Sequence, residues 1–188
     1  MGRNRRIIWG LLALAAAGYL TWCVLVMVDR LRAESQTRVC AQNLLILVRA
    51  MRAYTADYED TLPPAERWSD ALLPYVQERS LFVCPSGQNR VCSYAMNAAV
   101  GGLRTEEIGT PVVLLFESDA GWNAAGGPEL MPAEPRHFGG DRVGMTDWST
   151  NYRARAYERA GLTRRWLKKY AILGPSAWAP RGRSGTQR

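Results

Sequence analysis

The sequence predicts an α+β protein in which a long N-terminal, membrane-spanning helix packs on a small antiparallel β-sheet. The first observation is that residues 7–59 contain no proline, so nothing in this stretch breaks a helix. The second is that apolar residues recur at steps of three and four in its second half, which is the period of a helix with one buried face. The third is that residues 112–117 are β-branched and apolar between Pro111 and Ser118, as in a central strand.

The beginning of the long helix is predicted to be a transmembrane segment. Residues 7–28 form an almost wholly apolar run of 22 residues without a charge. At about 1.5 Å per residue such a run spans about 33 Å, which is enough to cross the hydrocarbon core of a bilayer. A cleaved signal peptide is less favoured, because the apolar run continues well past its small-residue segment at 13–17.

The basic residues before this run predict its orientation. Arg3, Arg5 and Arg6 lie within residues 1–6 and favour a cytoplasmic N-terminus, with the rest of the chain outside the cytoplasm. Since the segment is expected to be retained, the chain is predicted to cross a membrane once.

The outer half of the helix carries one apolar stripe that is expected to pack on the domain core. The stripe consists of Cys40, Leu44, Leu47, Val48, Met51, Tyr54, Thr55 and Tyr58. A globular domain at 29–151 is predicted to include this half of the helix. Within the domain we expect a short amphipathic segment at 67–76, with Trp68, Leu72, Leu73 and Val76 on one side, and further strands at 91–96 and 143–146.

Charge is distributed unevenly along the chain. Residues 29–152 contain 11 basic and 16 acidic side chains, whereas residues 153–188 contain 10 basic and one acidic. The sequence predicts a basic amphipathic helix at 152–174 and a disordered basic tail at 175–188. Nucleic acid would suit this charge, but the expected topology places the segment outside the cytoplasm, so no nucleic-acid partner is predicted. Anionic lipid, the chain's own acidic domain or solvent are the partners that stay open.

Three of the four cysteines are disulfide candidates. Cys23 lies within the apolar run, whereas Cys40, Cys84 and Cys92 would face an oxidising compartment. Cys84 with Cys92 is slightly favoured, because closing so short a loop costs little chain entropy; Cys40 with Cys84 is the alternative. Without a Cys-x-x-Cys motif or a cysteine–histidine cluster, no metal site and no cofactor is predicted.

Several short motifs follow the apolar run in a fixed order. They are CAQNL at 40–44, AMRAY at 50–54, DYED at 57–60, LPP at 62–64, LLPYV at 72–76, FVCPS at 82–86, SYAMN at 93–97 and LLFES at 114–118. Together they resemble bacterial type IV pilin-like and type II secretion pseudopilin-like proteins, in which Cys40 and Cys84 occupy family positions. The resemblance implies a pilin-like fold and a structural, non-enzymatic subunit of a secretion, pilus or envelope assembly. Its expected partners are similar subunits, with no small-molecule substrate.

Both ends of the chain depart from this family pattern. Many members end with a histidine, nine residues and Asp-Gly; here His137 and Asp147 keep the spacing, but Trp148 replaces the glycine. Prepilins also carry a glutamate at the fifth position of the hydrophobic helix, whereas this apolar run holds no acid. We therefore expect the chain to keep its N-terminus and to act as a lone or minor subunit.

His137 is the only histidine and so the only candidate for histidine-dependent chemistry. It would be a metal ligand or base with Asp141 or Asp147, or a structural residue whose ring ties backbone groups together. The structural interpretation is favoured because no nucleophile motif accompanies it, so no catalytic residue is predicted. The alternative function is a membrane-tethered extracytoplasmic binding or enzymatic domain that uses the His137 loop.

The acidic residues are expected to be solvated rather than to bind calcium. They are Asp57, Glu59, Asp60, Glu117 and Asp119. Calcium takes about six to eight oxygen ligands, and no loop of this chain concentrates that many acids.

Overall fold

The computed structural model describes residues 2–89, 91–137, 140–153 and 177–180. The chain divides into two compact units, Met1–Gln36 and Thr37–Arg188, and helix α1 (Gly2–Asp57) contributes to both. Most of the predicted basic helix, at 154–174, and the tail at 181–188 lie outside the described residues.

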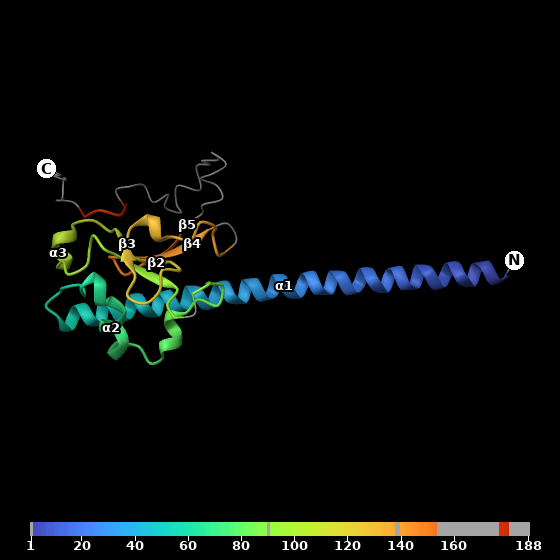
Figure 1. Cartoon of the computed structure of the whole chain (residues 1–188), viewed down its shortest axis with the longest axis horizontal. Coiled ribbons are helices and arrows are strands. Elements are labelled where there is room, and N and C mark those ends of the chain that lie inside the picture. Colours follow the sequence, from blue (N-terminus) through green and yellow to red (C-terminus); the bar gives the residue numbers. More distant parts are fainter. Residues whose placement is uncertain (1, 90, 138–139, 154–176, 181–188) are drawn as a thin grey trace. The chain divides into compact units, whose positions relative to one another are not determined.

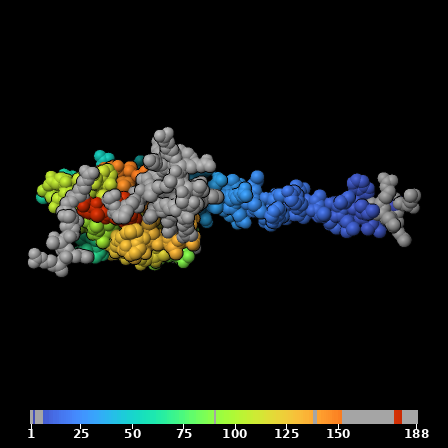
Figure 2. Space-filling model, turned by 90° about the horizontal axis from the view of Figure 1, so that it is seen from above, coloured from blue at the N-terminus to red at the C-terminus, as the bar shows by residue number. Residues whose placement is uncertain are grey.

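The first unit consists of the N-terminal part of α1. Its apolar side chains are exposed, with Trp9 at 65% and Leu14 at 73% of their full surface. In the space-filling view this part of α1 is the blue segment (Figure 2). By length and composition, α1 is the one helix among the described residues that could span a membrane.

The second unit contains the remainder of α1, whose apolar stripe packs into the core as predicted. Cys40, Leu44, Leu47, Val48 and Met51 are fully buried. The helix ends at Asp57, two residues before the predicted end, and Tyr58 beyond it is exposed. Glu59 and Asp60 have φ angles of 51° and 57°, a left-handed conformation that cannot continue a right-handed helix.

A five-stranded sheet packs against this part of α1 (Figure 1). Its strands are β1 (Tyr94–Asn97), β2 (Val113–Glu117), β3 (Ala125–Gly126), β4 (Asp141–Met145) and β5 (Thr150–Arg153). Their order is β3-β1-β2-β4-β5, which makes β2 the central strand. The strands predicted around 112–117 and 143–146 are therefore confirmed as β2 and β4.

The sheet is mixed, so the prediction of an antiparallel sheet is wrong at one edge. Strand β2 runs antiparallel to both β1 and β4, whereas β3 pairs with β1 in parallel. The reason lies in the connection after β2, where the chain reverses once and returns along the far side of β1. The backbone carbonyl of Ala124 in this connection accepts hydrogen bonds from Trp68 Nε1 and from the backbone N–H of Met96.

Two further elements differ from the prediction. Strand β1 begins at Tyr94 rather than at residue 91, and Val91 is half exposed. Tyr152 and Arg153 belong to β5, not to the start of a helix, because their backbone pairs with Arg142 and Asp141 of β4. The basic composition of this segment gave no sign of the hairpin formed by β4 and β5, because backbone hydrogen bonds pair the two strands.

The segment predicted as amphipathic is a chain of short helices. After the 3₁₀ turn η1 (Ala65–Arg67) come α2 (Trp68–Leu72), the 3₁₀ turn η2 (Leu73–Tyr75) and, further on, the 3₁₀ turn η3 (Arg79–Phe82). Trp68 and Leu72 are fully buried as expected, but Leu73 is exposed, so its predicted place on the buried side is wrong. The remaining helices are α3 (Thr105–Ile108) and the 3₁₀ turn η4 (Pro128–Leu130).

The other face of the sheet has its own apolar cluster. It contains Phe116, Met131, Val143 and Trp178. The ring of Trp178 lies edge-on to that of Phe116, with the ring centroids 5.1 Å apart. The backbone carbonyl of Trp178 accepts a hydrogen bond from Asn97 Nδ2 at 3.1 Å. Trp178, which lies in the predicted disordered tail, is thus packed on the sheet, because a large aromatic side chain gains from burial.

Gly144 marks the closest approach of β4 to α1. A Cβ atom at this position would overlap Val48 Cγ2. We expect Gly144→Ala to lower the free energy of unfolding by about 1–3 kcal/mol, the usual cost of overpacking a core, as measured by denaturant unfolding of the full chain in detergent. In a Val48→Ala background, where the overlapping methyl is absent, the same substitution should cost clearly less. Equal costs in the two backgrounds would contradict the contact.

Candidate functional site

A disulfide joins the helix to the loop that follows η3. Cys40 in α1 and Cys84 are bonded, with Cα atoms 5.0 Å apart and a separation of 44 positions in the sequence. The preference for Cys84 with Cys92 is therefore wrong, and the alternative pair forms. The entropy of closing the loop does not decide which cysteines pair, because the apolar stripe packs on the domain and this packing places the two distant cysteines side by side.

Cys92 remains a free, buried thiol. Its Sγ donates a hydrogen bond to the carbonyl of Tyr94 at 3.2 Å. Burial raises the pKa of this thiol to about 11. Because thiolate is the reactive form of cysteine, Cys92 is expected to be an inert packing residue.

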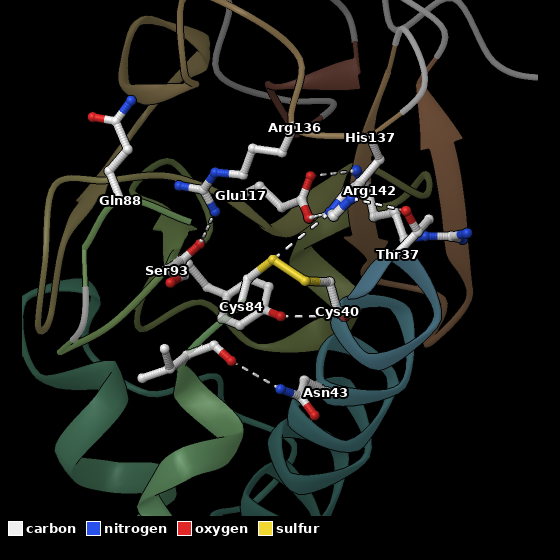
Figure 3. The surroundings of a disulfide bond; sticks show 12 residues. Thr37, Cys40, Asn43, Cys84, Gln88, Ser93, Glu117, Arg136, His137 and Arg142 are labelled. Carbon is white, nitrogen blue, oxygen red and sulfur yellow. Dashed lines mark hydrogen bonds and ion pairs between the residues drawn. A yellow bond between two sulfur atoms is a disulfide. The ribbon is translucent and has the colours of Figure 1, made fainter. Parts of the chain in front are cut away.

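His137 and Glu117 form a buried pair beside the disulfide (Figure 3). Nε2 of the imidazole lies 2.8 Å from Glu117 Oε1, and the two residues are 2% and 0% exposed. Nδ1 lies 3.3 Å from Thr37 Oγ1 of α1, and Glu117 Oε2 accepts the backbone N–H of Arg142 at 3.0 Å. The prediction that Glu117 is solvated is wrong, because the last residue of the buried strand β2 points into the domain.

The disulfide and the pair are in direct contact. Cys84 Sγ lies 3.7 Å from His137 Nε2. One ligand atom each from Cys40, Cys84, Glu117 and His137 can be chosen so that all four lie within 4.8 Å of one another. We call these four residues the Cys-His-Glu cluster. It joins α1, the loop after η3, the end of β2 and the segment before β4, so it ties the helix to the sheet.

His137 is positioned by its own backbone as well. Its N–H donates to the carbonyl of Gly140 at 3.2 Å, and its carbonyl accepts the N–H of Gly140 at 2.6 Å. The ring contacts the side chains of Glu117, Thr37 and Cys84, whereas the sequence indicated backbone partners. The structural interpretation predicted backbone partners for the imidazole ring, but the partners of the ring are side chains.

Asp147 serves the turn between β4 and β5. Its Oδ1 accepts hydrogen bonds from the backbone N–H and the hydroxyl of Ser149, at 3.0 and 2.6 Å. Trp148, the next residue, has a φ of 66°. The turn therefore keeps a conformation that favours glycine, and the carboxylate bonded to the imidazole is that of Glu117 rather than of Asp147.

Arg136 extends the polar surroundings of the cluster. Its guanidinium donates to the carbonyl of Ser93 at 2.9 Å and pairs with Asp119 at 2.6 Å. Burial works against the charged form of Asp119. Hydrogen bonds from Arg136 and the backbone of Asn89 outweigh it and lower the pKa of this carboxyl below its ordinary value of 3.8. Asp119 was expected to be solvated, but its carboxylate is bonded to Arg136 and to the backbone of Asn89.

This lowered pKa predicts a pH dependence of stability. A carboxyl whose pKa is lower in the folded chain stabilises it at pH values above the unfolded-state pKa, and that contribution is lost as the pH falls through the folded-state value. We expect Asp119→Asn to destabilise the chain at pH 7. The difference from the unsubstituted chain should shrink as the pH falls below 3.8. Denaturant unfolding at pH 7 and at a pH below 3.8 measures this difference in stability. A difference that grows on acidification would contradict the lowered pKa of Asp119.

Sequence reasoning missed Glu117 and Thr37 as partners of His137, and Arg142 as a partner of Glu117. A signal for Glu117 was present, since a single carboxylate ends the otherwise apolar run VVLLFE at 112–117. A charged residue on a buried strand requires a partner, and the only histidine was a candidate. In the disulfide form the cluster offers no thiol nucleophile, so its chemistry is that of a buried crosslink.

No protein-family model, no curated protein and no solved structure matches this chain.

Proposed function

We propose that this chain is a membrane-anchored, pseudopilin-like structural subunit of a bacterial secretion, pilus or envelope assembly. The observation that carries the proposal is the composition of α1. One helix has exposed apolar residues in its first part. In its second part, which belongs to an α+β domain, the stripe is fully buried from Cys40 to Met51. Such a helix suits a subunit that is held in a membrane and also contributes to the core of its own domain.

The proposed location is the bacterial inner membrane, with the N-terminus in the cytoplasm and the domain outside it. Arg3, Arg5 and Arg6 favour this orientation. The disulfide between Cys40 and Cys84 supports it independently, because disulfides persist in oxidising compartments and are rare in the cytoplasm.

The alternative, a tethered binding or enzymatic domain that uses the His137 loop, has less support. The imidazole is 2% exposed and both cluster cysteines are fully buried. A general base must come within hydrogen-bonding reach of its substrate, and here neighbouring side chains surround the ring. We therefore propose a structural rather than an enzymatic role.

The orientation is tested with two reporters fused after Arg188. A reporter that is active only in the cytoplasm should be silent, and one that is active only outside the cytoplasm should give a signal. As a control, replacing Arg3, Arg5 and Arg6 by glutamate should weaken this asymmetry. Cytoplasmic activity of the unsubstituted fusion would reverse the proposed topology.

The subunit role is tested by purification of the intact chain from bacterial membranes in mild detergent. The proposal predicts that other single-pass membrane subunits are recovered in a fixed ratio to this chain. Mass spectrometry of the same material should find residues 2–9 still attached. A mature N-terminus at Leu11, or sheared filaments made mostly of this chain, would contradict a minor subunit.

A further inference from the structure

The Cys-His-Glu cluster contains the side chains from which proteins build closed zinc sites. Zinc binds thiolate, imidazole and carboxylate, and structural zinc sites have four protein ligands in a tetrahedron. Cys40, Cys84, His137 and Glu117 supply two sulfurs, one nitrogen and one oxygen, all buried. Four residues from separate parts of the chain fill the full set, so no position is left for water or a substrate.

The distances are close to those of a tetrahedral site. With metal–sulfur bonds of about 2.3 Å and metal–nitrogen or –oxygen bonds of about 2.0 Å, neighbouring ligand atoms lie about 3.3–3.8 Å apart. Cys84 Sγ and His137 Nε2 are already 3.7 Å apart. His137 Nε2 and Glu117 Oε1, at 2.8 Å, would have to separate by roughly half an ångström to admit the metal. The ligand atoms lie within 4.8 Å of one another, so the most distant of them would have to approach by up to about 1 Å. The bond between the two sulfurs would have to be broken as well.

The surrounding residues orient the ligand atoms. Nδ1 of His137 lies against the hydroxyl of Thr37, which leaves Nε2 directed toward Glu117 and Cys84. The backbone N–H of Arg142 bonds Glu117 Oε2, so Oε1 is the oxygen on the cluster side. Contacts of this kind from outside the ligand set fix the ring and carboxylate of zinc ligands in known sites.

We propose that the dithiol form of this chain binds one zinc ion through Cys40, Cys84, His137 and Glu117, in place of the disulfide. A phosphine reductant supplies the two electrons that break the S–S bond and takes an oxygen atom from water. The two protons of that water go to the sulfurs, which become thiols. Zinc then displaces both protons and binds the two thiolates. The newly made chain, before its disulfide forms, is in this dithiol state without any reductant.

Zinc would therefore hold α1 to the sheet before oxidation does. Both crosslinks use Cys40 and Cys84, so they exclude each other. Formation of the disulfide has to release the metal, and zinc in turn protects the two thiols from oxidation. This inference does not depend on the proposed subunit role, since it concerns only the side chains within one domain.

The test compares the full chain in detergent in its oxidised and phosphine-reduced forms. After incubation with zinc and gel filtration, the reduced chain should carry one zinc ion and the oxidised chain none. Cobalt(II) in place of zinc should give thiolate-to-metal charge-transfer bands and the intense visible bands of a tetrahedral ion. X-ray absorption of the zinc form should show two sulfurs at about 2.3 Å and two nitrogen or oxygen atoms at about 2.0 Å.

Matched variants separate this site from the other thiols. Cys92→Ala, which removes the buried thiol outside the cluster, should leave zinc binding unchanged. Cys40→Ala with Cys84→Ala should weaken binding by at least about 100-fold, because only imidazole and carboxylate remain. Thr37→Val, which removes a contact of the ring but no ligand, should weaken binding by about 10-fold.

X-ray absorption and cobalt spectra of the unsubstituted chain keep the proposal testable even if a variant fails to fold. A reduced chain that binds no zinc, folded or not, overturns the proposal. So does a zinc ion with three sulfurs, which would show that Cys92 is recruited, or one bound by nitrogen and oxygen alone. Equal zinc binding by the oxidised and reduced chains overturns it as well.

Discussion

Replacing Cys40 and Cys84 together by alanine is expected to lower the free energy of unfolding of the oxidised domain by about 4 kcal/mol. The disulfide closes a loop between cysteines 44 residues apart, and restricting a loop of that length in the unfolded chain accounts for about 4 kcal/mol. Denaturant unfolding of the full chain in detergent, followed by tryptophan fluorescence and without added metal, measures the difference.

Cys92→Ala is the matched control for this experiment. It removes a cysteine that is equally buried but not crosslinked, so it should cost only what a small cavity costs, about 1 kcal/mol. A phosphine reductant should destabilise the unsubstituted chain but not the Cys40→Ala/Cys84→Ala variant. Equal sensitivity of both proteins to the reductant would contradict a stabilising role of this disulfide.

Removing His137 is expected to be the most costly change of a single side chain. Its ring bonds Glu117 Oε1 at 2.8 Å in a site where both residues are buried. His137→Ala leaves the carboxylate without this partner, and breaking a buried pair in this way costs about 3–5 kcal/mol. Thermal and denaturant unfolding of the oxidised chain should both report the loss.

The double variant Glu117→Leu/His137→Leu distinguishes loss of the pair from loss of packing. Replacing both members of a buried pair by apolar residues is often nearly neutral, so the double variant should be more stable than His137→Ala alone. A double variant less stable than His137→Ala would show that the polar contacts to Thr37 and Arg142 contribute more than the pair itself.

The parts of the fold that follow from local periodicity were predictable from the sequence. The stripe from Cys40 to Met51 repeats with the period of a helix, and β2 is a short β-branched run between proline and serine. These signals depend on neighbouring residues only. The structure confirms both elements, because burial of one face is the interaction that forms them.

Contacts between distant residues were not predictable in the same way. Cys40 reaches Cys84 because α1 packs on the domain, and Glu117 reaches His137 because β2 pairs with β4 rather than with the strand that follows it in the chain. Strand β3 is two residues long and parallel to β1, too short for any periodic signal. The four residues of the Cys-His-Glu cluster come from separate parts of the chain and share no regular spacing. A search for cysteine and histidine motifs therefore indicated no metal site.

The burial of Trp178 has a similar explanation. Composition predicted a disordered tail, because residues 175–188 are rich in glycine, proline and basic side chains. Composition averages over a segment, whereas the contact is made by the single side chain of Trp178, which packs edge-on against Phe116.

Crosslinking from position 23 in intact membranes tests the proposed subunit role most directly. Cys23 lies in the apolar part of α1, within the predicted membrane-spanning run, where a thiol-reactive reagent would not find the thiolate that it needs. A photoreactive amino acid incorporated in place of Cys23 during synthesis should, on illumination, join this chain to a different membrane subunit with an apolar N-terminal helix, and a sample kept in the dark should give no product. Only unlinked chain, or a ladder made of this chain alone, would contradict a minor subunit of a larger assembly.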